Sequence, residues 1–172
     1  NGTLLEKYAK DLKSNGINRI NISLDTINSK KYNEITRFGD LKNVIAGIEE
    51  AIKYNIKIKI NTVAIKNFNE NELEDLIYWS DKNRIDITFI EVMPMEETDQ
   101  NRHLQFAPLD KIYQKLNKKF NFNKINQNTG GPAVYYTSFK TSNKIGFITP
   151  MTNNFCASCN RVRITSTGKL FM

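Results

Sequence analysis

Two cysteines near the end of the chain are separated by two residues and followed by two arginines at alternate positions. They lie in the stretch FCASCNRVR at residues 155–163. Two thiolates at this spacing can bind one side of a metal ion or an iron–sulfur cluster, or can form a redox dithiol. A metal site usually needs three or four ligands, but there is no third cysteine, and the one histidine, His103, stands in a distant polar loop. A zinc site complete within this chain is therefore not favoured.

Three interpretations of Cys156 and Cys159 remain open. They form a dithiol, they are a buried inert pair, or they are a partial ligand set completed by residues outside this sequence. The last fits an internal fragment of a longer protein. The chain begins Asn1-Gly2 without a methionine and ends with the start of an apolar run.

The arginines and one lysine indicate an anion-binding site. A strand over 161–165 places Arg161 and Arg163 on one face, with their guanidinium groups about 7 Å apart, which suits a polyphosphate. Lys59 lies on a different predicted strand, over 56–63. The alternatives are surface ion pairs for the arginines and a surface position for Lys59.

The composition limits the class of protein. The chain has 172 residues, 40% hydrophobic and 25% charged, and a formal net charge of +7. The charge favours anionic partners, although scattered lysines on solvated helix faces would account for most of it. No apolar run reaches the roughly 18 residues of a membrane span, so no membrane is implied. Two cysteines do not make a disulfide scaffold, and a reducing compartment is expected.

Helix and strand patterns alternate along the first ninety-odd residues. Periodic apolar positions predict helices over 3–14, 29–35, 41–54 and from 69 onward, and strands over 17–24, 56–63 and 85–93. This order is typical of parallel strands joined by helical crossovers, and hence of an α/β fold.

The first two strands each have one apolar and one polar face. Asn21 and Ser23 point opposite to their isoleucine neighbours, and so do Lys59 and Asn61. A partial barrel whose polar side lines a cavity explains this pattern better than a doubly wound sheet. An open sheet with a solvent-exposed face is the alternative.

The rest of the chain is more irregular. We expect a polar loop over 94–107, a helix over 108–120 and a loop over 121–132. Strands over 133–139 and 144–149 would form an antiparallel hairpin with its turn at 141–143.

Six motifs, in this order along the chain, resemble one known family. They are NISLD at 21–25, KIN at 59–61, FIEVMP at 89–94, GPA at 131–133, IGFI at 145–148 and FCASCNRVR at 155–163. Each motif is weak alone, but the ordered set covers essentially the whole chain. The sequence resembles the radical S-adenosylmethionine GTP 3′,8-cyclases of molybdenum cofactor biosynthesis.

The resemblance implies a fold and an activity. Residues 1–95 would be βα units from the C-terminal half of a partial TIM-like barrel of the radical SAM type. Residues 96–172 would be a C-terminal extension with a β-hairpin and a cluster-binding loop. The parent enzyme, a lyase, would convert GTP to (8S)-3′,8-cyclo-7,8-dihydroguanosine 5′-triphosphate, the first step of the pathway.

The resemblance also implies cofactors and site residues. The parent would hold two [4Fe-4S] clusters and S-adenosyl-L-methionine. Ser23 and Met93 match residues that contact S-adenosylmethionine. Cys156 and Cys159 match two ligands of the second cluster. Residues that contact GTP are matched by Lys59, Arg161, Val162 and Arg163.

The expected partners follow from the same family. They are GTP and a downstream cyclic pyranopterin monophosphate synthase. The parent enzyme would be a homodimer in the cytoplasm and would bind neither a membrane nor a nucleic acid. The chain lacks the radical-generating Cys-x-x-x-Cys-x-x-Cys and the third ligand of the second cluster, so we expect it to be inactive alone. Thr88 stands where many members have an arginine, which puts one cofactor contact in doubt.

Two alternative functions remain. The first is another radical SAM enzyme with an auxiliary cluster, which would lack the two arginines after the cysteines. The second is a non-enzymatic, basic nucleic-acid-binding module, which would lose affinity steeply with salt.

Overall fold

The computed structural model describes residues 1–93, 102–127, 131–152 and 163–171. The helices in these ranges are α1 (Leu5–Ser14), α2 (Ser29–Thr36), α3 (Leu41–Lys53), α4 (Leu73–Lys82), the 3-10 helix η1 (Arg102–Gln105) and α5 (Leu109–Phe120). The strands are β1 (Arg19–Ser23), β2 (Lys57–Ala64), β3 (Asp86–Glu91), β4 (Asn123–Ile125), β5 (Val134–Ser138), β6 (Thr141–Ile148), β7 (Arg163–Ile164) and β8 (Leu170–Phe171).

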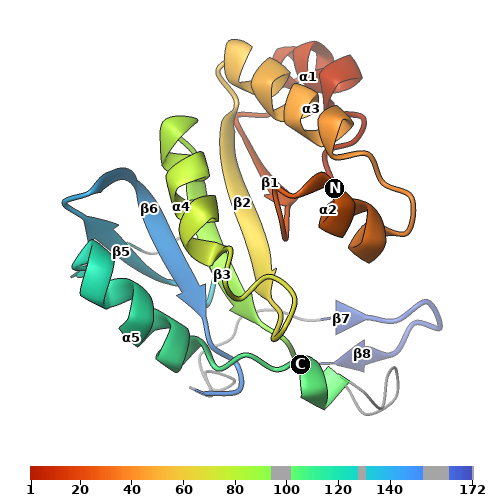
Figure 1. The fold of residues 1–172 in the computed structure, drawn as a ribbon. Helices are drawn as coiled ribbons and strands as arrows, with labels where there is room; N and C mark the ends of the chain where they lie inside the picture. Colours follow the sequence, from red (N-terminus) through yellow and green to blue (C-terminus); the bar gives the residue numbers. More distant parts are fainter. Residues whose placement is uncertain (94–101, 128–130, 153–162, 172) are drawn as a thin grey trace.

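Six of the strands form one mixed sheet (Figure 1), in the order β1-β2-β3-β6-β5-β4. The first four are mutually parallel, and β5 and β4 continue the sheet in antiparallel pairing. Strands β7 and β8 pair separately. The predicted α/β class is therefore confirmed. The partial barrel stays a prediction, because the described strands form an open sheet.

One face of the sheet is buried under helices. Along β2, Ile58, Ile60, Thr62 and Ala64 are buried while the residues between them are partly exposed, as the alternating sequence predicts. Helix α3 contacts β2, α4 contacts β3 and β6, and α5 contacts β3. The opposite face, which carries the polar side chains, receives none of these helices.

Helices α1 and α3 pack closely because of one glycine. A Cβ on Gly47 would stand 2.7 Å from the Gly2 carbonyl oxygen and 2.9 Å from the Leu5 Cβ. The side chains of α1 differ in their exposure. Leu5 and Ala9 are buried against α3, whereas Leu4 and Tyr8 are exposed.

The antiparallel part of the sheet corrects two expectations. The turn between β5 and β6 lies at residues 139–140, and the predicted turn at 141–143 is the start of β6. Contacts with α4 override the local turn preference there, because Asp81 Oδ1 accepts from Ser142 N at 2.7 Å and Asn143 Nδ2 donates to Ser80 Oγ at 2.7 Å. Strand β4 lies inside the stretch predicted to be a loop.

Candidate functional site

The polar face of the sheet brings side chains from several strands into one row. Ser23, Asn61, Thr88 and Gly146 are Cα partners in register across β1, β2, β3 and β6, and Tyr135 of β5 pairs with Gly146. The side chains of register partners on neighbouring strands lie on the same face of the sheet. The alternation seen in the sequence thus becomes a continuous polar strip across the sheet.

Lys59 lies at the edge of this strip and is partly buried. Its Nζ donates to the Tyr135 hydroxyl at 3.2 Å and stands 5.9 Å from the centre of the Tyr135 ring. Asp86 is the register partner of Lys59 on β3, but its carboxylate accepts from Lys144 N at 2.9 Å. No ion pair joins Lys59 to a carboxylate within the ranges that the structure describes.

Two buried polar atoms on the same strip lack partners. The Asn61 Oδ1 and the Thr88 Oγ1 have no hydrogen-bond partner among the described residues, and Thr88 is 0% exposed. Buried polar atoms in folded proteins are nearly always paired, so such atoms mark places where a ligand or another part of the protein completes the bonding. The strip therefore fits a polar ligand.

Gly146 makes room for this arrangement. A Cβ at this position would stand 2.8 Å from Thr88 Oγ1 and 3.0 Å from Tyr135 Cε1. The Tyr135 ring consequently lies over β6 and reaches toward β2. A glycine inside a strand often marks such a close approach, and this was the one sequence signal that could have found Tyr135.

The two residues predicted to contact S-adenosylmethionine lie near the carboxyl ends of parallel strands. Ser23 is the last residue of β1 and is exposed, and Met93 follows β3 by two residues and is partly buried. Ligands of α/β proteins commonly bind at this edge of the sheet. Within the described residues, Ser23, Met93 and Lys59 share no hydrogen bond or ion pair with one another.

A buried network closes the carboxyl ends of β1 and β2. The Asp25 carboxylate accepts from Val63 N at 2.7 Å, and burial raises the pKa of this carboxyl from its ordinary value. Asn69 Nδ2 donates to the carbonyl oxygens of Asp25 and Val63 at 2.7 and 2.8 Å. These bonds shape the loop that follows β1 and β2.

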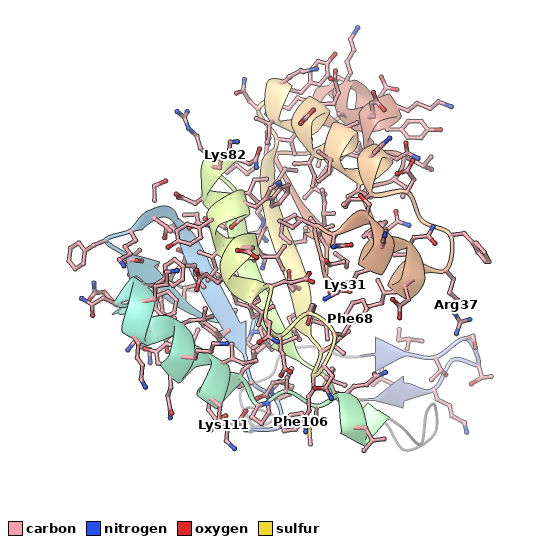
Figure 2. The ribbon with its side chains drawn as sticks, viewed as in Figure 1. Lys31, Arg37, Phe68, Lys82, Phe106 and Lys111 are labelled. Carbon is pink, nitrogen blue, oxygen red and sulfur yellow. The ribbon has the colours of Figure 1, made fainter. Side chains whose placement is uncertain are left out.

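Lys31 of α2 also belongs to this end of the sheet. Its Nζ forms an ion pair with Glu72 and stands 5.4 Å from the centre of the Phe68 ring, and Figure 2 shows Lys31 and Phe68 beside one another. Glu72 also accepts from the Thr26 hydroxyl at 2.6 Å. Lys31 is thus neutralised within the fold, in contrast to Lys59.

Glu91, at the end of β3, is a buried anchor. It is 1% exposed, and its carboxylate accepts from the backbone N–H groups of Leu109, Met151 and Thr152 at 2.9 to 3.1 Å and from the Thr152 hydroxyl. Several donors offset the cost of burying a carboxylate. Glu91 therefore ties the start of α5 and the segment after β6 to the end of β3.

The remaining predicted site residues cannot be placed. Cys156, Cys159, Arg161 and Val162 lie outside the described residues, and for Arg163 the structure gives the backbone, in β7, but not the side chain. Among the described residues no group of three histidine, cysteine, aspartate or glutamate side chains could hold a metal ion.

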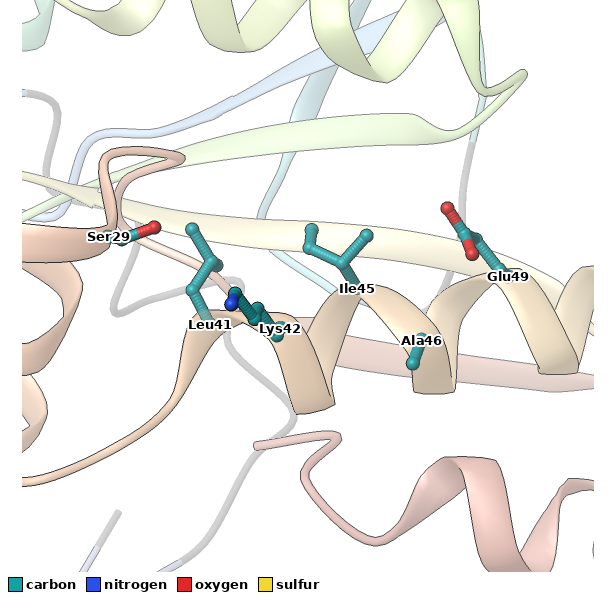
Figure 3. A pocket seen from close by; sticks show the side chains of 6 residues that line it. All are labelled: Ser29, Leu41, Lys42, Ile45, Ala46 and Glu49. Carbon is teal, nitrogen blue, oxygen red and sulfur yellow. The ribbon is translucent and has the colours of Figure 1, made fainter.

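Two surface hollows lie away from the polar strip. The one in Figure 3 has a volume of about 330 Å³ and lies on α3 beside Ser29, with lining residues Ser29, Leu41, Lys42, Ile45, Ala46 and Glu49. The other, of about 280 Å³, is lined by Ile27, Asn28, Glu72 and Asp75. Neither contains a residue predicted to bind a ligand. Within the described part of the chain, no helix has the length and apolar character needed to cross a membrane.

Comparisons with known proteins agree with this α/β arrangement. Residues 1–79 match the Radical SAM superfamily. Residues 85–172, just over half of the chain, match the family described as Molybdenum Cofactor Synthesis C. The chain belongs to this Molybdenum Cofactor Synthesis C family.

Curated relatives share this similarity along the whole chain. The GTP 3′,8-cyclase of Brucella ovis is 48% identical over 172 residues, which are 100% of this chain and 50% of the relative. The GTP 3′,8-cyclase of Bradyrhizobium diazoefficiens is 49% identical over 170 residues, 99% of this chain and 49% of the relative. That of Rhizobium etli is 47% identical over 172 residues, 100% of this chain and 49% of the relative. The chain thus spans about half the length of the curated relatives it matches.

Proposed function

We propose that this chain supplies an internal part, about half of the length, of a GTP 3′,8-cyclase, a radical SAM lyase of molybdenum cofactor biosynthesis. The observation that carries the proposal is the 48% identity that extends over all 172 residues to a curated enzyme of that name. The polar strip supports it, because it presents one ammonium group and two buried oxygen atoms that lack partners among the described residues, on the face opposite to α3, α4 and α5.

The strip has the chemistry to hold a nucleoside triphosphate. Lys59 offers a positive charge that no described carboxylate neutralises, which suits a phosphate oxygen. The Asn61 oxygen needs a donor, such as a sugar hydroxyl or a base N–H, and the Thr88 hydroxyl can donate or accept. We assign Lys59, Arg161, Val162 and Arg163 to GTP and Ser23 and Met93 to S-adenosylmethionine.

Cys156 and Cys159 are assigned to one of two [4Fe-4S] clusters. The soft thiolate ligands suit iron, and two cysteines are too few for a cluster, so other residues of the full-length protein must complete the set. The other cluster, with S-adenosylmethionine bound, would supply the radical chemistry. Glu91 supports the assignment of the two cysteines by fixing the chain at Met151 and Thr152, shortly before Cys156.

The organisation and partners are part of the same proposal. Residues 1–95 would belong to a partial barrel and 96–172 to the C-terminal extension, with β6 of the second part joining the sheet of the first. We infer a cytoplasmic homodimer whose product passes to a cyclic pyranopterin monophosphate synthase.

The test compares two lysines of β2 in the full-length protein. Lys59→Met removes the ammonium group of the strip, and Lys57→Met is the matched control, since Lys57 lies on the same strand and face but is exposed at its amino end. Removing a hydrogen bond to a charged group should weaken GTP binding by about tenfold to a hundredfold for Lys59→Met and by less than about twofold for the control.

Activity is measured anaerobically with a reductant and S-adenosylmethionine, by following the cyclised nucleotide. We expect product from the full-length protein and none from the 172-residue chain alone. A full-length protein with both clusters loaded that leaves GTP unchanged would refute the proposed activity.

A further inference from the structure

The contact between Lys59 and Tyr135 spans most of the width of the sheet. Lys59 lies on β2 and Tyr135 on β5, with β3 and β6 between them. Three strand spacings separate the two backbones by roughly 14 Å. Both side chains must therefore extend toward each other along the polar face for the 3.2 Å hydrogen bond to form.

Small residues on the two intervening strands allow this reach. Gly146 has no side chain, and a Cβ there would stand 3.0 Å from the Tyr135 ring. Thr88, its register partner on β3, is short and 0% exposed. Tyr135 is itself 1% exposed, so its ring is held by packing and its hydroxyl has a fixed position.

The phenol oxygen is a neutral acceptor. It holds one N–H of the Lys59 ammonium without cancelling the charge, which leaves the charge and the other N–H donors available to an anion. A lysine side chain is otherwise among the most mobile, and ordering it on binding costs entropy. A hydrogen bond formed beforehand lowers that cost.

We propose that Tyr135 is a positioning residue that holds the Lys59 ammonium group on the polar strip for a phosphate of the nucleotide. This inference rests on the proposed function, in which Lys59 binds GTP. Tyr135 acts through Lys59 and needs no contact with the nucleotide.

The first experiment replaces the tyrosine in the full-length protein by Tyr135→Phe, which removes the hydroxyl and keeps the ring. Binding is measured for GTP and for guanosine, which has no phosphate. We expect the Kd for GTP to rise about tenfold, because a hydrogen bond to a charged group is lost, and the Kd for guanosine to stay within about twofold. An equal loss for both ligands would indicate a structural role and overturn the inference.

Tyr136→Phe is the matched control. Tyr136 is the next residue on the same strand but faces the helices. There the centre of its ring lies 5.7 Å from the centre of the Phe147 ring, and its hydroxyl forms a hydrogen bond with Tyr113. Loss of that hydroxyl should lower the thermal midpoint and leave both Kd values unchanged. A rise in the Kd for GTP equal to that of Tyr135→Phe would show that the effect is not specific to the polar face.

A double-mutant cycle separates the inference from the proposed function. If Lys59→Met weakens GTP binding and Tyr135→Phe has no further effect in that background, Tyr135 acts through Lys59. If Lys59→Met weakens binding but Tyr135→Phe alone does not, the inference fails and the proposed function stands. If Lys59→Met itself leaves GTP binding unchanged, Lys59 has no role in binding the nucleotide and both fail.

Discussion

Two buried threonines on neighbouring strands show how one hydroxyl can serve the fold and another a site. Thr62 of β2 and Thr88 of β3 are both 0% exposed. The Thr62 hydroxyl donates to the Leu24 carbonyl oxygen at 2.7 Å, whereas the Thr88 hydroxyl has no partner among the described residues. Burial without a hydrogen bond costs free energy, so the sequence keeps Thr88 at a cost to stability.

We therefore expect opposite results from one substitution at the two positions. Valine has nearly the shape of threonine without the hydroxyl. Thr88→Val should raise the free energy of unfolding by about 1 kcal/mol, because it removes an unsatisfied group, and Thr62→Val should lower it by about 1–2 kcal/mol, because it leaves the Leu24 carbonyl unpaired. Urea denaturation of the full-length protein without ligands measures both changes.

A destabilisation by Thr88→Val as large as that by Thr62→Val would contradict this expectation. It would mean that the Thr88 hydroxyl is bonded in the whole protein to a residue beyond the described ranges. The polar strip would then be part of the packing rather than a place for a ligand.

The parallel strands were predictable from the sequence because burial on one face leaves a strong period-two pattern. The strands predicted over 17–24, 56–63 and 85–93 are confirmed as β1, β2 and β3 within a few residues at each end. The same pattern correctly assigned Lys59 and Asn61 to the less buried face. Helices α2, α3 and α5 also begin within a residue of their predicted starts.

Other features depend on contacts that a local pattern does not contain. Strand β4 has three residues and no alternation, and exists because β5 offers an edge to pair with. Tyr135 was missed for the same reason. Its hydroxyl meets Lys59 across 76 residues of sequence, and the alternation of β5 shows which face it occupies but not what it reaches.

The contact of α1 with α3 gives a test at the scale of these elements. Alanine normally favours a helix over glycine by about 1 kcal/mol. At Gly47 the added Cβ would stand 2.7 Å from the Gly2 carbonyl oxygen, which is backbone and cannot rotate away. Gly47→Ala should therefore lower the free energy of unfolding by about 1–3 kcal/mol, since overpacking outweighs the helix preference.

Asn43→Ala on the exposed side of α3 is the control for this prediction. Asn43 is exposed, so the substitution should raise the free energy of unfolding by a few tenths of a kcal/mol through helix preference alone. Thermal denaturation of both variants gives the comparison. Stabilisation by Gly47→Ala would show that α1 can move away from α3 without loss.

At the scale of the whole molecule, the important feature is the outer edge of β1. Among the described strands, β1 pairs with β2 on one side and with none on the other. Leu24 N donates to the Asn61 carbonyl oxygen, and the Asn18 carbonyl oxygen accepts from Lys57 N. The backbone N–H and C=O groups of the even-numbered residues of β1 therefore point toward β2. The N–H groups of Asn21 and Ser23 therefore point outward, and open edges of this kind are normally covered in native proteins.

Relatives twice as long as this chain have the residues to cover this edge, and a further parallel strand there would extend the sheet toward a barrel. We expect the Asn21 amide to exchange its hydrogen rapidly in the 172-residue chain and at least about a hundredfold more slowly in the full-length protein.

The Ile22 amide, which faces β2, is the internal control. Its slow exchange in both proteins shows that the sheet is folded in each, and hydrogen exchange read by NMR resolves the two amides. Equal protection of Asn21 in both proteins, with the short chain monomeric by sedimentation, would mean that no additional strand pairs at β1, and the barrel interpretation would be wrong.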